Sequence, residues 1–321
     1  MELISVIMSV YNEPERMLRE SIESILKQTH QKLEFIIVLD NPSNKIARKV
    51  LYEYAHNDPR IRVLENPENI GLALSLNRAL EVVRGKYVAR MDADDVSALD
   101  RLERELERLQ AGGFDVVFTG VTIVDEEGAL VRQYPVASEE PSYIREILPY
   151  CCIVCHPSVM MRTSVLKAVG GYRNFYAAQD YDLWLRLLFL GYRFGCIRYP
   201  LLNYRIRKES ITESRAFVQH ESARYIRKLY RQRMRKKTDS YSWENYNLYL
   251  KRRGLDSENT IKRFSQTKGM CFKARREAKA GNFKDFVACA LKSLKGFRWE
   301  WYSLRLALIK KRIDRKYAGR K

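Results

Sequence analysis

The 321 residues predict an α/β protein: a doubly wound, mostly parallel sheet with an added hairpin, followed by a basic and mainly α-helical C-terminal region. Two observations lead to this fold class. Apolar runs of strand length alternate with amphipathic helical stretches, which implies right-handed crossovers between parallel strands. Charge is also uneven, because residues 1–215 hold 28 Lys and Arg against 30 Asp and Glu, whereas residues 216–321 hold 30 against 9. We therefore expect two domains, 1–215 and 216–321.

The hydrophobic pattern places each element of the sheet. Near-continuous apolar runs indicate strands that are buried on both faces; they span residues 3–10, 35–39, 61–64, 87–91 and 114–118. The segments between them repeat apolar residues every three or four positions, as helices that cover a sheet do. These helices are expected from Pro14, around Ala47, from Leu72 and from Leu99. The turn at 125–128 indicates a hairpin added after the fifth strand.

Composition excludes several classes of protein. With 46% hydrophobic and 30% charged residues, the chain can bury a core and is not disordered throughout. No apolar run reaches the roughly 18 residues of a membrane-spanning helix, and no basic leader precedes the first strand. Six irregularly spaced Cys residues fit a reducing compartment better than a disulfide framework. We expect a cytoplasmic protein, with peripheral attachment to the inner face of the membrane through its basic region.

Polar residues follow three of the buried strands: Tyr11 and Asn12 the first, Asp40 the second, and the DADD run at 92–95 the fourth. In an open parallel sheet, ligands bind beyond the carboxyl ends of the strands. For Asp40 by itself, a structural role in a turn or at a helix N-cap explains the residue as well as ligand binding does. Three carboxylates within four residues repel one another, and at a buried strand end protonation or a cation must relieve that repulsion. Oxygen ligands suit Mg²⁺ or Mn²⁺, so the DADD run is predicted to hold a metal ion on a diphosphate.

Glycine-rich phosphate loops are missing from the sequence. Neither G-x-G-x-x-G after the first strand nor G-x-x-x-x-G-K-S/T occurs. This disfavours dinucleotide oxidoreductases and P-loop ATPases. Without such a loop, a phosphate ligand depends on the metal.

The second half of the body holds weaker candidates. Asp180 stands just before an apolar helical stretch, where an ordinary N-cap is expected. His156 by itself is more often a hydrogen-bonded structural residue than a catalyst. The Cys residues at 151, 152 and 155 resemble a soft-metal cluster only faintly. No second ligand pair follows at a zinc-like distance, so a half-buried strand is the favoured interpretation.

Taken together, these segments resemble the family 2 inverting glycosyltransferases, whose nucleotide-binding core is the GT-A fold. The resemblance covers about residues 3–215 and depends on an ordered set of motifs. They are SVIMSVYNEP at 5–14, Asp40, NIGLALSLNRAL at 69–80, GKYVARMDADD at 85–95, HPSVMMR at 156–162, GGY at 170–172 and QDYDLWLRL at 179–187.

The resemblance implies a role for each matching residue. Ser9, Tyr11 and Asn12 would line the nucleotide pocket, and Asp40 would hydrogen-bond the nucleobase. Asp92 and Asp94 match the two acids of the family's DxD motif, which hold the ribose and the metal ion on the diphosphate. Asp95 would share in binding the metal. Asp180 matches the catalytic base. His156, Gln179 and Arg207 are further expected contacts of the diphosphate or the acceptor.

Two of these positions depart from the family pattern. Many relatives carry an acidic residue where Gln179 stands, and losing that neighbouring charge should leave Asp180 easier to ionise. Many relatives carry His where Arg207 stands, and either residue could face the diphosphate.

The expected function is inverting transfer of a sugar, from a UDP-sugar in the first instance, to a hydroxyl of a glycan or lipid-linked saccharide in surface polysaccharide biosynthesis. The metal meets the charge of the departing diphosphate, and a carboxylate takes the proton of the attacking hydroxyl. Two alternatives stay open. A sugar-phosphate nucleotidyltransferase uses a similar sheet but usually a glycine-rich loop at 11–14, and a non-catalytic basic interaction protein would not need Asp180.

The basic third interleaves Lys and Arg with aromatic and aliphatic residues, notably in 224–237 and 298–312. Helices of this composition suit an anionic membrane surface. A solvated helical cap that packs on the body is the plainer interpretation. Nucleic acid ranks last, because the body contains no nucleic-acid-binding motif.

Overall fold

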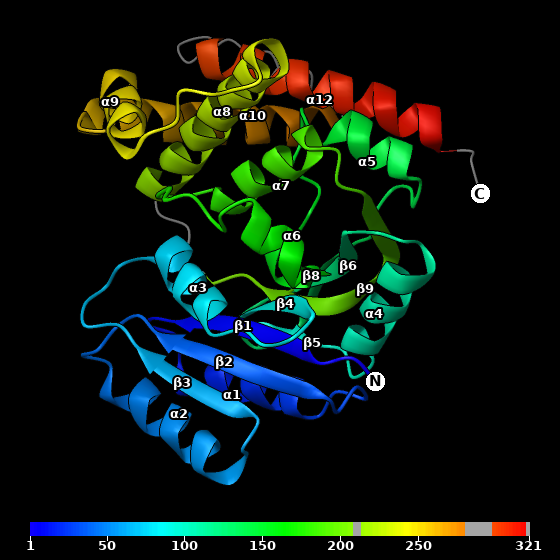
Figure 1. Cartoon of the computed structure of the whole chain (residues 1–321). Helices are drawn as coiled ribbons and strands as arrows, with labels where there is room; N and C mark the ends of the chain where they lie inside the picture. Colours follow the sequence, from blue (N-terminus) through cyan, green and yellow to red (C-terminus); the bar gives the residue numbers. More distant parts are fainter. Residues whose placement is uncertain (208–212, 280–296, 319–321) are drawn as a thin grey trace. The chain divides into compact units, whose positions relative to one another are not determined.

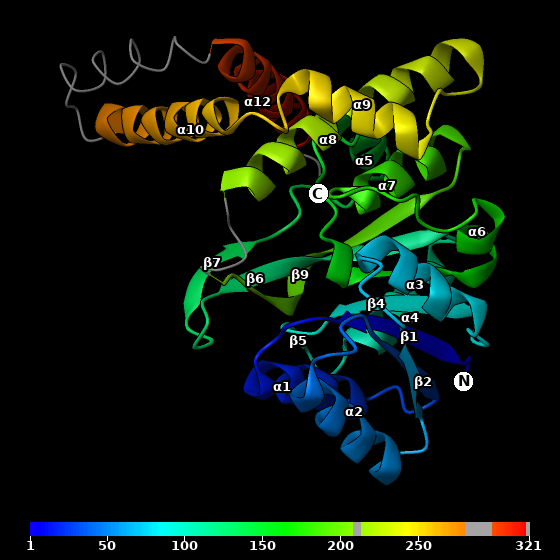
Figure 2. The ribbon, with the colours of Figure 1, turned by 90° about the vertical axis from the view of Figure 1, so that its left-hand side faces the viewer.

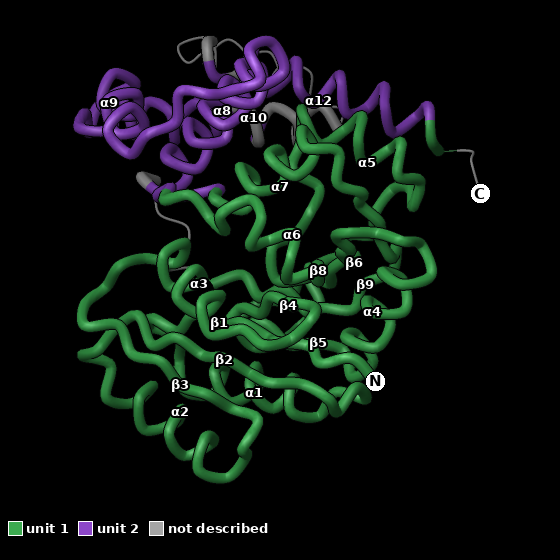
Figure 3. Tube along the Cα trace, in the orientation of Figure 1, with its two compact units in different colours: residues 1–174, 179–207, 317–321 green, residues 175–178, 208–316 purple. Residues whose placement is uncertain are grey.

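The computed structural model describes residues 1–207, 213–279 and 297–318, in two compact units (Figure 3). Unit 1 comprises residues 1–174 and 179–207, together with the C-terminal end from residue 317. Unit 2 comprises residues 208–316 and the short segment 175–178. The division of the chain into a catalytic domain, 1–215, and a basic C-terminal region, 216–321, stays a prediction.

Unit 1 alternates strands and helices in the predicted order (Figure 1). Its strands are β1 (Ile4–Val10), β2 (Leu33–Leu39), β3 (Ile61–Glu65), β4 (Tyr87–Asp92), β5 (Val96–Ser97), β6 (Val116–Val124), β7 (Leu130–Tyr134), β8 (Val159–Arg162) and β9 (Phe194–Arg205). Its helices are α1 (Glu15–Leu26), α2 (Lys45–Asn57), α3 (Leu72–Glu81), α4 (Arg101–Ala111), α5 (Pro141–Ile147), α6 (Thr163–Ala168) and α7 (Gln179–Phe189).

The sheet runs in the order β3-β2-β1-β4-β8-β6-β9-β5, and β7 pairs with β6. Strands β3, β2, β1 and β4 are parallel, as are β6 and β9, whereas β8 lies antiparallel between β4 and β6. The mixed α/β class is confirmed, and so is the hairpin. One detail was wrong: the fifth strand and the first hairpin strand are a single strand, β6, which continues into the turn at 125–128.

The two faces of the sheet carry different layers (Figure 2). Val6 and Met8 of β1 pack into a core with apolar residues of α1, α2 and α4. Side chains alternate along a strand, so Ile7 and Ser9 point to the opposite face, which α3 covers. The same alternation places Arg90 and Asp92 of β4 on the face of Ser9, because Ala89 and Met91 belong to the core.

Two expectations for the second half of unit 1 were wrong. The segment 151–155 is not a strand; it leads irregularly into a 3-10 turn at His156–Ser158, and β8 begins only at Val159. Pro157 has no N–H for a strand ladder, and the Ser158 hydroxyl turns back to donate to the Cys155 carbonyl at 2.8 Å. Asp180 is not an N-cap, because α7 already begins at Gln179.

Unit 2 contains the helices α8 (Glu213–Lys236), α9 (Trp243–Arg253), α10 (Glu258–Lys279) and most of α12 (Phe297–Tyr317). This confirms the mainly helical C-terminal region. Helix α9 has a Ser242 N-cap and ends at Gly254, whose φ of 97° lies in the left-handed region that favours glycine. In the part of the chain that is described, no helix is both long and apolar enough to cross a bilayer.

Gly85, just before β4, lies against β1 with no room for a side chain. A Cβ there would lie 2.5 Å from Ser5 Oγ and 2.7 Å from Ser5 N. We expect Gly85→Ala to lower the free energy of unfolding by about 1–3 kcal/mol, as overpacking in cores does. Urea unfolding measures this. Gly269→Ala is the control, because Gly269 lies in α10 with nothing within 4 Å of its added Cβ, and it should stabilise its helix by up to about 1 kcal/mol. Equal unfolding midpoints for Gly85→Ala and the wild type would contradict the steric argument.

Candidate active site

Strand register brings the predicted nucleotide residues to one edge of the sheet. Ser9 lies beside Asp92 in the β1–β4 pairing, and Val10 lies beside Leu39 in the β1–β2 pairing. Tyr11 and Asp40 therefore follow their strands side by side. Parallel strands with aligned carboxyl ends produce this gathering.

The expected nucleobase contact, Asp40, is buried and already well bonded. Its carboxylate accepts from Asn66 Nδ2 at 2.7 Å and from the amides of Ile70 and Gly71, each at 2.9 Å. Asp40 thus fixes the loop that opens α3. Tyr11 is 40% exposed and Asn12 accepts from Asn41 Nδ2 at 2.6 Å, so both remain near the surface. The nucleotide contacts of these residues stay predictions.

Asp92 is paired with an arginine that sequence reasoning missed. Arg90 is only 3% exposed, and it forms an ion pair with Asp92 through Nη2. The spacing of Arg90 and Asp92 could have indicated this pair, because side chains two residues apart on a strand point to the same face. The Arg90 guanidinium is close enough to act on the pKa values of Asp94, Asp95 and Asp180.

The other two aspartates of the DADD run differ in exposure, because Asp94 is half-buried and Asp95 is buried. Arg207 Nε lies 3.1 Å from Asp94 Oδ2, an ion pair that is not aligned as a hydrogen bond. Asp95 is buried; its Oδ1 accepts from the Arg205 amide at 2.8 Å, while Oδ2 has no hydrogen-bond partner among the described residues. Burial, reinforced by Asp92, raises the pKa of Asp94 to about 6 and holds the pKa of Asp95 well above its usual range.

Glu13 is a fourth carboxylate at this site, and sequence reasoning gave it no individual role. Burial raises its pKa, and the charges of Asp92 and Arg207 both reach it. Glu13 thus adds a fourth negative charge to the three of the DADD run, and these charges act on one another. Repulsion of this kind is relieved by protonation or by a bound cation.

The residues present fit a divalent ion that a ligand helps to hold. Among the described residues, no three His, Cys, Asp or Glu side chains are spaced to bind a metal ion by themselves. Mg²⁺ commonly takes one or two protein carboxylates and completes its shell with phosphate oxygens and water. The orphaned Oδ2 of Asp95 and the raised pKa of Asp94 are consistent with such a site.

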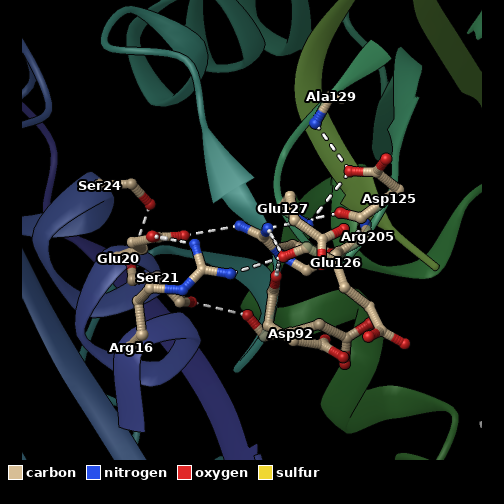
Figure 4. Close-up of polar contacts among 12 residues, drawn as sticks. Arg16, Glu20, Ser21, Ser24, Asp92, Asp125, Glu126, Glu127, Ala129 and Arg205 are labelled. Atoms are coloured by element: carbon tan, nitrogen blue, oxygen red, sulfur yellow. Dashed lines mark hydrogen bonds and ion pairs between the residues drawn. The ribbon is translucent and has the colours of Figure 1, made fainter. Parts of the chain in front are cut away.

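The backbone is hydrogen-bonded at alternate carbonyls, from Arg90 just before the DADD run to Asp94 within it; Figure 4 shows the bond from Ser21 to Asp92. Arg101 donates to the carbonyl of Arg90 at 3.3 Å, the Ser21 hydroxyl to that of Asp92 at 2.7 Å, and Arg205 Nε to that of Asp94 at 2.8 Å. Three different elements, α4, α1 and β9, supply these donors. With these carbonyls bonded, the backbone of the segment is held in place, so it cannot move to separate the aspartates.

Arg205 is the centre of this arrangement, and no local sequence pattern indicated this role. Besides the Asp94 carbonyl, it donates to Glu20 Oε2 at 2.7 Å and to the Glu126 carbonyl at 2.8 Å. Arg16 reaches the same two partners, with distances of 2.6 Å to the Glu126 carbonyl and 2.8 Å to Glu20. Arg205 thus connects α1, the DADD run and the β6–β7 turn (Figure 4).

Asp180 lies in the first turn of α7, within the electrostatic reach of Asp92. Burial raises its pKa to about 6, although the Tyr181 amide and Arg90 act in the opposite direction. A carboxylate with this pKa is ionised at neutral pH and is a stronger base than an exposed aspartate. Asp180 is therefore suited to accept a proton beside the acidic run.

His156 and Gln179 are both buried. The His156 Nε2 atom is 2.9 Å from the Tyr172 hydroxyl, and the ring lies edge-on to Trp184. Burial, and secondarily Arg90, holds the pKa of His156 well below its usual range, so the ring is neutral. Ligand contacts of His156, Gln179 and Arg207 stay predictions.

Comparison with known proteins identifies the family. Residues 5–170 match the model of glycosyl transferase family 2. An uncharacterised glycosyltransferase of Methanocaldococcus jannaschii, MJ1057, is 39% identical over 208 residues, which are 64% of this chain and 71% of that protein. The O-antigen biosynthesis glycosyltransferase WbnJ of Escherichia coli is 33% identical over 230 residues, 70% of this chain and 87% of WbnJ.

Solved structures show the same fold at low identity. Residues 1–349 of Staphylococcus aureus TarS, solved with UDP-GlcNAc, superpose with a TM-score of 0.59 at 16% identity and 92% coverage of each chain. The mannosyltransferase PcManGT of Pyrobaculum calidifontis, solved with GDP-Man and Mn²⁺, gives a TM-score of 0.53 at 16% identity, covering 98% of this chain and 86% of that one. The chain belongs to glycosyltransferase family 2 and is a glycosyltransferase with a GT-A-type core.

Proposed function

We propose that the protein is an inverting glycosyltransferase that transfers a sugar from a nucleotide-diphosphate sugar to a hydroxyl of a glycan or lipid-linked saccharide. A UDP-sugar is the first candidate donor, and surface polysaccharide biosynthesis is the proposed setting. One observation carries the proposal: a base-competent Asp180 shares an electrostatic environment with the DADD run. The O-antigen relative and the UDP-GlcNAc complex of the TarS structure support the setting and the donor.

In the proposed reaction, Asp180 takes the proton of the acceptor hydroxyl while the hydroxyl oxygen bonds to the anomeric carbon. The bond from that carbon to the diphosphate oxygen breaks on the opposite side, so the configuration inverts. Asp180 then releases its proton to solvent. General-base assistance of this kind contributes roughly 10²–10⁴ in rate.

Asp94 and Asp95 would hold Mn²⁺ or Mg²⁺, with Asp92 directed to the ribose. When bound, such an ion neutralises negative charge that develops on the departing diphosphate. The Mn²⁺ complex of PcManGT supports a divalent ion for this fold. Arg207, which now lies against Asp94, is placed to meet the diphosphate as a second positive charge. The nucleotidyltransferase and non-catalytic alternatives are no longer favoured, because the relatives are glycosyltransferases.

We also propose that α12 attaches the protein peripherally to an anionic membrane, where a lipid-linked acceptor is found. Trp301, Leu304 and Leu308 are 58%, 45% and 59% exposed and lie at helical spacing on one face. Exposed basic residues continue that face toward the C-terminus: Arg305, Lys311, Arg312 and Arg315. Tryptophan and leucine followed by arginine and lysine suit insertion at a lipid headgroup layer.

Substitutions of Asp94 and Asp180 should separate donor binding from sugar transfer. Asp94→Ala should abolish metal-dependent binding of UDP-GlcNAc, measured by calorimetry with Mn²⁺. Asp180→Asn should keep that binding and slow sugar transfer at least about 100-fold, because it removes the base. Asp100→Asn is the control, since Asp100 pairs with Arg104 at the start of α4 outside the site. Transfer at the wild-type rate by Asp180→Asn would refute the base assignment.

The rate of transfer should depend on pH through Asp180. Its pKa is raised to about 6, so the carboxyl is protonated and inactive as a base at lower pH. With saturating metal and donor, kcat should fall about tenfold per pH unit below pH 6 and level off above it. Asp94 has a similar pKa, so the donor Kd must be measured over the same range. A flat kcat profile from pH 5 to 7 would be inconsistent with the proposal.

Vesicle binding tests the α12 face. The double variant Leu304→Ser/Leu308→Ser should lose at least tenfold in affinity for phosphatidylcholine vesicles that contain phosphatidylglycerol, because each buried leucine contributes about 1.5–3 kcal/mol. Leu248→Ser is the matched control, since Leu248 is 46% exposed on α9. Co-sedimentation provides the measurement. If both variants bind as the wild type does, α12 is not the attachment surface.

A further inference from the structure

A cavity of about 290 Å³ lies within unit 2, among α8, α10 and α12. The side chains that matter for its chemistry are His220, Arg227, Phe264, Lys268, Trp299 and Ser303. None of the described residues that line it is acidic. Its volume equals that of about ten water molecules, which is enough for a diphosphate group. The proposed donor site lies in unit 1, so this cavity is a separate feature.

Part of the cavity wall is aromatic, formed by Phe264 and Trp299. The rings of Phe264 and Trp299 meet edge to face with centroids 5.5 Å apart, and Phe217 packs against Phe264 at 5.4 Å. The His220 ring lies 5.3 Å from Phe264. Ala216 and Ala223, two turns apart on α8, leave room where larger side chains would fill the space.

Three basic side chains of unit 2 lie within electrostatic reach of His220. Burial, together with Arg227, Arg224 and Lys268, lowers the pKa of His220 to about 4, whereas Glu221 acts in the opposite direction. Glu221 is already bonded to Arg253 Nε at 2.8 Å, the Tyr249 hydroxyl at 2.8 Å and Trp299 Nε1 at 3.1 Å. Like charges gathered in this way raise the free energy of the protein unless an anion binds among them.

Donor atoms around the cavity are also left unused. His220 Nε2 and Arg224 Nη1 are buried and have no hydrogen-bond partner among the described residues. Arg227 is stacked on the Tyr302 ring at 5.2 Å and donates to its hydroxyl at 2.7 Å, which fixes the guanidinium. A fixed guanidinium with further N–H donors close by suits the oxygens of a phosphate.

We propose that this cavity is a second binding site, which takes a phosphate or diphosphate group through Arg227, Lys268 and His220. The group comes either from a soluble phosphate compound or from the headgroup of a lipid. Arg227 is itself buried, which strengthens its attraction to phosphate oxygens.

Binding of inorganic pyrophosphate tests the proposal, with the full chain at low salt and in EDTA. Without divalent metal, the carboxylates of unit 1 repel pyrophosphate, so calorimetry reports the cavity. Lys268→Gln should weaken binding at least fivefold. Lys262→Gln is the matched control, an exposed lysine on the same helix that does not line the cavity. No binding by the wild type, or equal losses in both variants, would overturn the proposal.

A second variant distinguishes the cavity from a charged surface. Ala223→Leu fills the cavity without changing any charge, and it should abolish pyrophosphate binding while the melting temperature stays the same or rises. If Lys268→Gln weakens binding but Ala223→Leu does not, the phosphate binds to surface charge and the cavity is not a site.

Vesicles of phosphatidylcholine with phosphatidic acid identify the source of the phosphate. If pyrophosphate displaces the wild type from these vesicles and Ala223→Leu binds them more weakly, the cavity takes a lipid headgroup. If Ala223→Leu loses pyrophosphate but binds the vesicles as the wild type does, the cavity takes a soluble phosphate. Both results uphold a phosphate site. Neither depends on sugar transfer, so the proposed catalytic function is tested separately.

Discussion

The hydrogen bonds to the backbone carbonyls of the DADD run are the interactions on which the rest of the candidate site depends. Three aspartates that repel one another would move apart on a free loop. Here the carbonyls of Arg90, Asp92 and Asp94 are bonded from α4, α1 and β9, so the backbone cannot yield to the repulsion. Burial, with the charge of Asp92 added to it, raises the pKa values of Asp94 and Asp95. A rigid scaffold thus keeps negative charge where a cation and a diphosphate would neutralise it.

The two units gather charge of opposite sign. In unit 1, Glu13 lies within electrostatic reach of Asp92 and Asp94 at the DADD run. In unit 2, two arginines and a lysine act on a histidine, and the neighbouring Glu221 is bonded to Arg253. Our proposals give each cluster a complementary ligand: a divalent ion on a diphosphate would bind at the first, and a phosphate group at the second.

Much of this could be predicted from the sequence. Apolar runs located the parallel strands, and the polar residues that follow them gathered at one edge, because parallel strands align their carboxyl ends. The errors arose where local pattern was ambiguous. Residues 151–155 have strand-like composition, but Pro157 cannot join a ladder. Asp180 has the residue type of a cap, yet α7 begins one residue earlier. The apolar run at 114–118 gave no sign that β6 continues to Val124.

Sequence by itself determined the order of strands and helices, the family, and which acidic residues we propose for the chemistry, because hydrophobic period and short motifs are local properties. Tertiary structure alone decided which partners those residues have. Arg205 lies 111 positions from Asp94, and no local pattern connects them. Likewise, the raised pKa of Asp180 comes from burial, and the cavity beside His220 exists only where three helices meet. Charge balance depends on distance in space, and the packing of the whole chain sets that distance.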